Sequence, residues 1–199
     1  YTYMGTGCIF EYNISGKKNS EEDAPNFFGS SYSIVKGYTD RLQHMYSKNT
    51  LNLRIRMPII NYDHDRNFIT KITNYKKICS IPNSMTVLND LLPVMIDMSL
   101  TYKKGTINLT NPGLISHNEI LTMYKEIVDP NFTWENFSVE EQNQILASKR
   151  SNNCLNTEKL ESISHIKIKD IKTSVRDIII KMKSNETIDK KIFVSLQAL

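Results

Sequence analysis

The chain has 199 residues, a formal net charge of +4, 40% hydrophobic residues and 23% charged residues. This balance is that of an ordinary globular protein, which excludes wholesale disorder, and only seven glycines exclude a collagen-like repeat. No apolar run approaches the ~18 residues of a membrane span, and the small, dispersed positive charge does not point to nucleic acid. The length fits one domain, or one and a fraction.

The three cysteines, Cys8, Cys79 and Cys154, are widely spaced and form no CxxC pair. An odd, scattered set of this kind predicts free thiols in a reducing compartment, and we expect a cytoplasmic protein. No histidine has metal-ligand spacing to a cysteine or a carboxylate, so we predict no metal site. The first residue is Tyr1 rather than Met, and we expect the chain to be a fragment that opens inside a domain.

The first half predicts a strand, a loop, a helix and a second strand. Residues 1–9 have the pattern of a strand that runs into a polar loop at 11–30. Residues 31–47 carry apolar side chains three and four apart, which predicts a helix, and 51–57 alternate as in a strand that Pro58 stops. This order indicates a parallel α/β crossover.

The second half predicts more helices and one short strand. We expect a short helix at 67–75 and a longer one along the apolar stripe at 88–100. Because Pro93 lies inside that stripe, we expect the longer helix to begin only just before the proline, where a proline is tolerated. A short strand is predicted at 106–110, and a turn follows it.

Two capping boxes and an apolar stripe predict three later helices. The boxes are formed by Ser116 with Glu119 and by Ser138 with Glu141. The last helix carries the apolar stripe at 171–182. The histidines at helices or helix ends are predicted to lie at the surface; they are His44, His117 and His165.

The best candidates for chemistry are a hydroxyl, a phenol and an amine. Gly5–Gly7 is not a phosphate-binding loop, because Phe10 replaces the third glycine of the dinucleotide motif and no helix pattern follows. Tyr32 and Lys36 are four apart and so share one helix face. An ammonium beside a phenol favours the phenolate, which makes the phenol a better proton donor and acceptor. The spacing is common on surface helices, but Thr6, at the end of a strand, adds a group that can hold a substrate carbonyl.

Thr6, Tyr32 and Lys36 match the Ser/Thr, Tyr and Lys triad of the extended short-chain dehydrogenases/reductases. Longer segments resemble the nucleotide-rhamnose synthases, the bifunctional 3,5-epimerase/4-reductases that finish UDP-L-rhamnose or dTDP-L-rhamnose. These segments are Tyr3–Tyr12, Glu21–Ser30, Arg54–Ile59, Arg66–Ile72, Ile81–Leu88 and Arg150–Asn153. The last one is also similar to a stretch of the dTDP-4-dehydrorhamnose reductases. The glycine-rich NADP site of the family, roughly its first third, has no counterpart in this chain.

The resemblance implies an α/β fold, namely the C-terminal two-thirds of a Rossmann-fold reductase with a parallel sheet, flanking helices and a small, mostly helical substrate domain. Residues 1–58 would be the remaining part of the Rossmann domain and carry the catalytic groups. Residues 87–111 would form a helix and a strand that return to its sheet. Residues 59–86 and 112–199 would form the substrate-binding domain.

The resemblance also implies a mechanism. A nucleoside-diphospho-4-keto-6-deoxyglucose would be epimerised at C3 and C5 and reduced at C4 with NADPH. Tyr32 would protonate the C4 oxygen, Lys36 would bind the nicotinamide ribose, and Thr6 would hydrogen-bond the carbonyl. Epimerisation needs acid/base groups on both faces of the sugar, and the resemblance assigns them to Cys8 and Lys71.

Several assignments stay open. His64 is an alternative to Lys71 as the second acid/base. Asn67 and Arg150 are candidates to bind the nucleotide diphosphate, since arginine offers a planar fork of donors to phosphate. The remaining cofactor contacts are assigned to the backbone around Met57, Pro58 and Ile59.

The alternative to an enzyme is a non-catalytic binding protein on the same fold, similar to the regulatory subunit of methionine adenosyltransferase. Lost active-site residues would mark such a protein, whereas this chain keeps all of those named above. As an enzyme, the chain would bind a nucleotide-sugar substrate and a second copy of itself in a homodimer. We expect it to bind neither nucleic acid nor a membrane. The sequence does not discriminate between UDP and dTDP.

Overall fold

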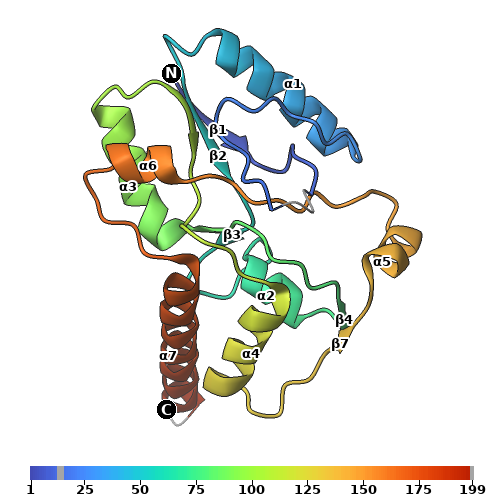
Figure 1. Ribbon diagram of the computed structural model, residues 1–199. Coiled ribbons are helices and arrows are strands. Elements are labelled where there is room, and N and C mark those ends of the chain that lie inside the picture. The colour runs from blue at the N-terminus through green and yellow to red at the C-terminus, as the bar shows by residue number, and fades with distance from the viewer. Residues whose placement is uncertain (13–15, 198–199) are drawn as a thin grey trace.

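A three-stranded parallel sheet forms one part of the computed structural model, which describes residues 1–12 and 16–197 (Figure 1). Its strands are β1 (Thr2–Thr6), β2 (Leu51–Ile55) and β6 (Gly105–Asn108), in the order β1-β2-β6. Thr6 is paired with Ile55 at the carboxyl end of the sheet. The predicted parallel α/β arrangement is therefore confirmed. The predicted loop at 11–30 lies partly outside the described residues, at 13–15.

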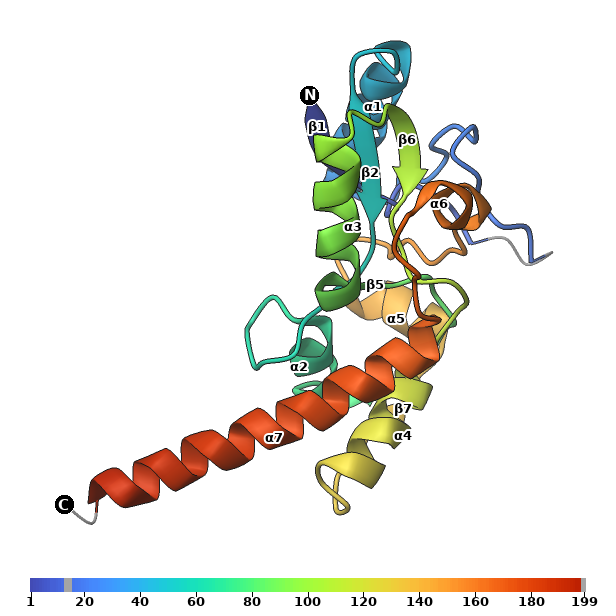
Figure 2. The same ribbon diagram turned by 90° about the vertical axis from the view of Figure 1, so that its left-hand side faces the viewer.

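Helices cover both faces of this sheet, and an apolar cluster fills the space on one side. Helices α1 (Ser31–Met45) and α3 (Leu88–Leu100) lie on opposite faces, and α6 (Glu158–Ile163) packs near β6 (Figure 2). The cluster between β2, β6, α3 and α6 consists of Leu51, Leu53, Leu91, Val94, Met98, Ile107, Leu109 and Leu160. Burial of these side chains holds α3 and α6 against the sheet.

A second, mostly helical part lies beyond the carboxyl ends of β1 and β2 (Figures 1 and 2). Its helices are α2 (Phe68–Thr73), α4 (His117–Ile127), α5 (Val139–Ile145) and α7 (Ile171–Gln197). Its short parallel strand pairs are β3 (Pro58–Ile59) with β5 (Thr86–Val87), and β4 (Lys77–Ile78) with β7 (Glu135–Asn136). The core cluster here is formed by Ile59, Ile69, Ile72, Ile78, Met85, Val87, Ile115, Ile120, Leu121, Ile171, Val175, Ile178 and Ile179.

Local sequence signals located most of the helix starts. Both predicted capping boxes are present, at the first residues of α4 and α5. The start predicted for α3 was wrong: the helix begins at Leu88 and Pro93 lies inside it. Its buried stripe, Leu91, Val94 and Met98, spans the proline, and packing of that stripe outweighs the one lost backbone hydrogen bond. In the part of the chain that the structure describes, no helix is both long and apolar enough to cross a membrane.

His117 is half-buried, although the sequence-based prediction placed it at the surface. It is the first residue of α4, and its ring packs edge-on against Phe68 with 5.2 Å between the ring centroids. Its Nδ1 atom is buried without a hydrogen-bond partner. Burial lowers the pKa of His117 to about 4, while a hydrogen bond with the backbone of Ile81 acts in the other direction. The pattern around His117 shows a capped helix start but not that Phe68 covers it.

This buried imidazole predicts a loss of stability in mild acid. Its unfolded pKa is near 6.5 and its folded pKa is about 4, so between these values only the unfolded chain takes up the proton. The free energy of unfolding is expected to fall as pH drops from 6.5 to 4, by up to about 3 kcal/mol. Urea unfolding at several pH values measures this slope.

His117→Phe should flatten that slope because it removes the titrating group and keeps a ring against Phe68. His64→Gln is the control and should leave the slope unchanged, because that imidazole is exposed and the described residues form no ion pair with it. An equally steep slope in His117→Phe would assign the acid sensitivity to other groups.

Candidate active site

The carboxyl ends of β1 and β2 carry the first predicted site residues. Thr6 ends β1 and is almost buried, and the Gly7 N–H donates to the Ile55 carbonyl at 2.9 Å. The Thr6 Oγ1 accepts a hydrogen bond from the Cys8 backbone N–H at 3.1 Å, so the hydroxyl proton remains available for a substrate oxygen. Cys8 is a half-buried free thiol. In α/β sheets, ligands bind outside the carboxyl ends of parallel strands, where this corner lies.

A buried guanidinium fixes this corner, although the sequence did not single it out. Arg56 is 1% exposed and donates to the carbonyls of Gly7 at 3.0 Å, Ser84 at 3.2 Å and Ser151 at 2.9 Å. Burial lowers the pKa of Arg56, and the nearby thiols Cys8 and Cys154 act in the opposite direction. Arg56 therefore locks the chain between Thr6 and Cys8 to the segment that follows Arg150.

Arg150 lies on a segment that crosses next to this corner. Before it, the Lys149 N–H donates to the Gly29 carbonyl at 3.2 Å. After it, the Ser151 hydroxyl donates to the Phe10 carbonyl at 2.7 Å. The Arg150 side chain itself is exposed. The fold thus brings Arg150, far along the chain, to the loop that follows β1 and to the start of α1.

Helix α1 carries the phenol and the amine. Ser30 caps the helix by accepting from the Ser33 N–H at 3.1 Å, and Tyr32 follows in the first turn with 52% of its surface exposed. Lys36 lies one turn later and donates to the hydroxyl of Tyr3 at 2.9 Å. This bond raises the pKa of Lys36, and the phenol of Tyr32 adds to the effect, so Tyr32 is within electrostatic range of the ammonium.

Among the described residues, Thr6 and Tyr32, the other pair of the predicted triad, are not in direct contact through a hydrogen bond between their side chains. Tyr3, which binds Lys36 directly, was missed as a separate residue. The signal that could have found it is its place on the strand that ends at Thr6.

The predicted cofactor contacts follow directly after β2. Met57 has a φ of 40°, a left-handed conformation that is unfavourable for a side chain with a Cβ. Before Met57, the Arg56 carbonyl accepts from the Thr86 N–H, and the Arg56 N–H donates to the Thr86 hydroxyl. After Met57, Pro58 and Ile59 pair with β5. Such strained residues cluster at functional sites, which makes Met57 a candidate contact.

Asn67 and Lys71 lie on α2, beyond the carboxyl ends of the sheet (Figure 2). The Asn67 amide is fully used inside the chain: its nitrogen donates to the carbonyls of Ile60 and Tyr62 at 3.1 and 2.9 Å, and its oxygen accepts from the Ile69 N–H. This geometry gives Asn67 a structural task as the cap of α2, and its substrate role stays a prediction. The Lys71 side chain is exposed on the last turn of α2.

His64, the alternative to Lys71, is exposed, and its Nδ1 accepts from the Arg66 N–H at 3.0 Å. No hydrogen bond or ion pair in the described part of the chain links Cys8 to Lys71 or to His64. The position of the second acid/base therefore stays a prediction.

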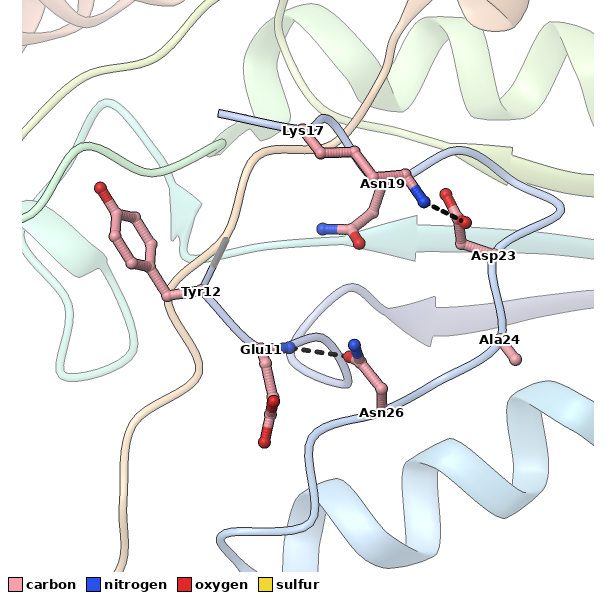
Figure 3. Close-up of a pocket in the computed structure, with 7 residues that line it drawn as sticks. All are labelled: Glu11, Tyr12, Lys17, Asn19, Asp23, Ala24 and Asn26. Carbon is pink, nitrogen blue, oxygen red and sulfur yellow. Dashed lines mark hydrogen bonds and ion pairs between the residues drawn. The ribbon is translucent and has the colours of Figure 1, made fainter. Parts of the chain in front are cut away.

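Two open pockets lie beside this region. One, of about 420 Å³, is lined by Glu11, Tyr12, Lys17, Asn19, Asp23, Ala24 and Asn26, and the ion pair of Lys17 with Asp23 spans part of its wall at 2.9 Å (Figure 3). The other, of about 510 Å³, is lined by Glu11, Phe27, Phe28, Gly29, Asn143, Leu146, Ala147 and Lys149. The second pocket is lined by Lys149, which precedes Arg150, and by Gly29, three residues before Tyr32, so it is the better candidate for a substrate.

Solved structures and curated proteins agree on the relationship of this chain. The crystal structure of the UDP-rhamnose synthase from Acanthamoeba polyphaga mimivirus is 56% identical and superimposes with a TM-score of 0.87, over 91% of this chain and 64% of that one. The chain is a close homologue of this UDP-rhamnose synthase. It spans about 64% of the length of this viral relative. No protein-family model matches it.

Two further relatives extend the nucleotide-rhamnose synthase comparison. The bifunctional dTDP-4-dehydrorhamnose 3,5-epimerase/dTDP-4-dehydrorhamnose reductase of Arabidopsis thaliana is 50% identical over 163 residues, 79% of this chain and 54% of that protein. A dTDP-4-dehydrorhamnose reductase from Bacillus anthracis, solved in complex with NADP, shares 16% identity with a TM-score of 0.72, over 91% of this chain and 65% of that one. This last likeness shows the Rossmann-type fold alone.

Proposed function

We propose that the chain carries the catalytic and substrate-binding part of an NADPH-dependent 3,5-epimerase/4-reductase that acts on a nucleoside-diphospho-4-keto-6-deoxyglucose. The observation that carries the proposal is the corner at the end of β1, where Thr6 and Cys8 lie together and Arg56 ties Arg150's segment to them. The names of the viral and plant relatives support the same chemistry. The alternative of a non-catalytic binding protein lacks support, because the triad residues are all present.

The residues of this chain divide into a reducing set and an epimerising set. Thr6 donates a hydrogen bond from its hydroxyl to the C4 carbonyl, and Tyr32 transfers a proton to the C4 oxygen as reduction proceeds. Lys36 holds a positive charge beside Tyr32 and offers its remaining N–H groups to the ribose hydroxyls of the cofactor. NADPH, when bound, supplies the hydride for C4.

Three observations fit the nicotinamide end of that cofactor. Lys36 keeps two N–H groups beyond the one bound to Tyr3, Met57 has a left-handed backbone, and Met57 follows the carboxyl end of β2. We assign the contacts to Tyr32, Lys36 and the backbone of Met57, Pro58 and Ile59.

We also propose a compartment and partners for the enzyme. The three cysteines are all free, which fits a cytoplasmic, reducing environment. A nucleotide sugar is the proposed substrate, with Arg150 beside its diphosphate. The homodimer and the absence of nucleic acid, membrane and metal as partners remain predictions.

The test of this function is turnover by the protein expressed from the full reading frame that encodes the chain. It should consume NADPH in the presence of UDP- or dTDP-4-keto-6-deoxyglucose and release the rhamnose nucleotide, identified by mass spectrometry and proton NMR. If the protein consumes NADPH with neither UDP- nor dTDP-4-keto-6-deoxyglucose, the proposal is contradicted.

Epimerisation can be separated from reduction by substitution of the two acid/base candidates. Cys8→Ala and Lys71→Ala should each slow deuterium incorporation from solvent at C3 and C5 by about 10²-fold, since general acid/base catalysis is worth at least that much. Reduction of a keto sugar supplied already epimerised should survive in both variants.

Two results would speak against this assignment. Normal exchange in both variants places the acid/base pair elsewhere, with His64→Ala the next variant to measure. Loss of reduction with the pre-epimerised sugar in both variants means that these side chains hold the site together rather than move protons.

A further inference from the structure

Tyr3 makes two contacts with one ammonium group. Its hydroxyl accepts a hydrogen bond from Lys36 Nζ at 2.9 Å, and the same nitrogen lies 5.1 Å from the centroid of its ring. Both side chains are half-buried between β1 and α1. A hydrogen bond and a cation–π contact together confine a side chain that otherwise samples many rotamers.

The neighbouring contacts show that this is part of an ordered joint between α1 and the sheet. In the register of β1 and β2, Tyr3 lies beside Asn52, and the Asn52 amide donates to Asp40 at 2.8 Å. Lys36 and Asp40 are one turn apart on α1 and point to the same face. Neighbouring strand residues therefore bind successive turns of α1, and Gly5 leaves room for the Asn52 side chain, which would lie 2.4 Å from a Cβ there.

We propose that Tyr3 is a positioning residue for Lys36, which directs the ammonium toward Tyr32 and the cofactor ribose before either is engaged. This role rests on the proposed reductase function. One N–H of Lys36 is bound by Tyr3, and two remain for the site. The raised pKa of Lys36, caused first by the bond to Tyr3, is consistent with a permanently charged group at this place.

The first arm of the test measures the ammonium itself in the protein from the full reading frame. Tyr3→Phe removes the hydroxyl and keeps the ring, and Tyr1→Phe, on the same segment and 80% exposed, is the matched control. Trace labelling with acetic anhydride across a pH series, resolved by peptide mass spectrometry, reports the titration and accessibility of Lys36. In Tyr3→Phe, Lys36 should titrate at lower pH and label several-fold faster than in the parent chain or in Tyr1→Phe.

The second arm measures catalysis in the protein from the full reading frame. Tyr3→Phe should lower kcat for reduction of the epimerised keto sugar about tenfold, the size expected from loss of one hydrogen bond to a charged group. KM for the sugar should stay near its parent value, because Tyr3 does not touch the substrate. Tyr1→Phe should change neither constant.

Each other outcome overturns the proposal in a recognisable way. Unchanged labelling of Lys36 in Tyr3→Phe means that the hydroxyl does not hold the ammonium. Altered labelling with unchanged kcat means that the contact is structural only. An inactive parent protein removes the proposed function, and this role with it, whatever the labelling shows.

Discussion

Tyr32→Phe is expected to slow oxidation of NADPH by the keto sugar about 10²–10⁴-fold, the usual contribution of a positioned general acid. The substitution removes only the hydroxyl, so the ring and its packing at the start of α1 remain. Tyr32 is 52% exposed, which leaves room for a substrate oxygen and makes an effect on folding small. KM for the sugar should therefore change little while kcat falls.

The same helix offers a matched control. Tyr38 is also on α1, is 71% exposed and takes no part in the proposed site, so Tyr38→Phe should keep the parent turnover. The decrease in NADPH absorbance measures both variants. Near-normal turnover in Tyr32→Phe would assign the proton to another group, and Tyr3, the next phenol beside Lys36, would be the first to substitute.

The regular elements could be predicted because their signals are local. The capping boxes of α4 and α5 depend on residues three apart, and the strand β2 shows its alternation within a few residues. The short pairs β3 with β5 and β4 with β7 were missed, since each strand has two residues and is defined only by a partner far along the chain.

The burial of β2 was harder to predict than its existence. Its alternation suggests one apolar face and one polar face, yet Arg54, on the polar face, and Arg56, just after the strand, are each 1% exposed. They are buried because long-range partners meet them: Asp40 of α1 for Arg54, and the Gly7 and Ser151 carbonyls for Arg56. Sequence spacing contains no record of such partners.

The candidate site shows the same limit. Thr6, Tyr32 and Lys36 were found from residue types and a family resemblance, and their roles in the reaction remain predictions. The link between Tyr3 and Lys36 depends on the register of α1 against β1, which only the fold supplies. The second acid/base is hardest for the same reason, because Lys71 belongs to a helix in the other part of the molecule.

The largest expected effect on stability comes from the ion pair that attaches α1 to β2. Asp40 and Arg54 are 3% and 1% exposed, and the guanidinium makes two parallel bonds to the carboxylate, Nε to Oδ1 at 2.8 Å and Nη2 to Oδ2 at 2.7 Å. Asp40→Ala would leave a buried charge without its partner. Breaking such a pair typically lowers the free energy of unfolding by about 3–5 kcal/mol, which urea denaturation of the chain would measure.

Two comparisons separate this cause from a general loss of packing. Glu126→Ala breaks the exposed pair with Arg176, whose atoms are 3.6 Å apart, and should cost less than about 1 kcal/mol. Asp40→Ala with Arg54→Met removes both charges and keeps an apolar stem near the Phe10 ring, so it should be more stable than Asp40→Ala alone. If the double variant is instead the less stable one, the stranded charge is not the cause. The attachment of α1 would then depend on the other groups that meet this helix, Asn52 and Tyr3.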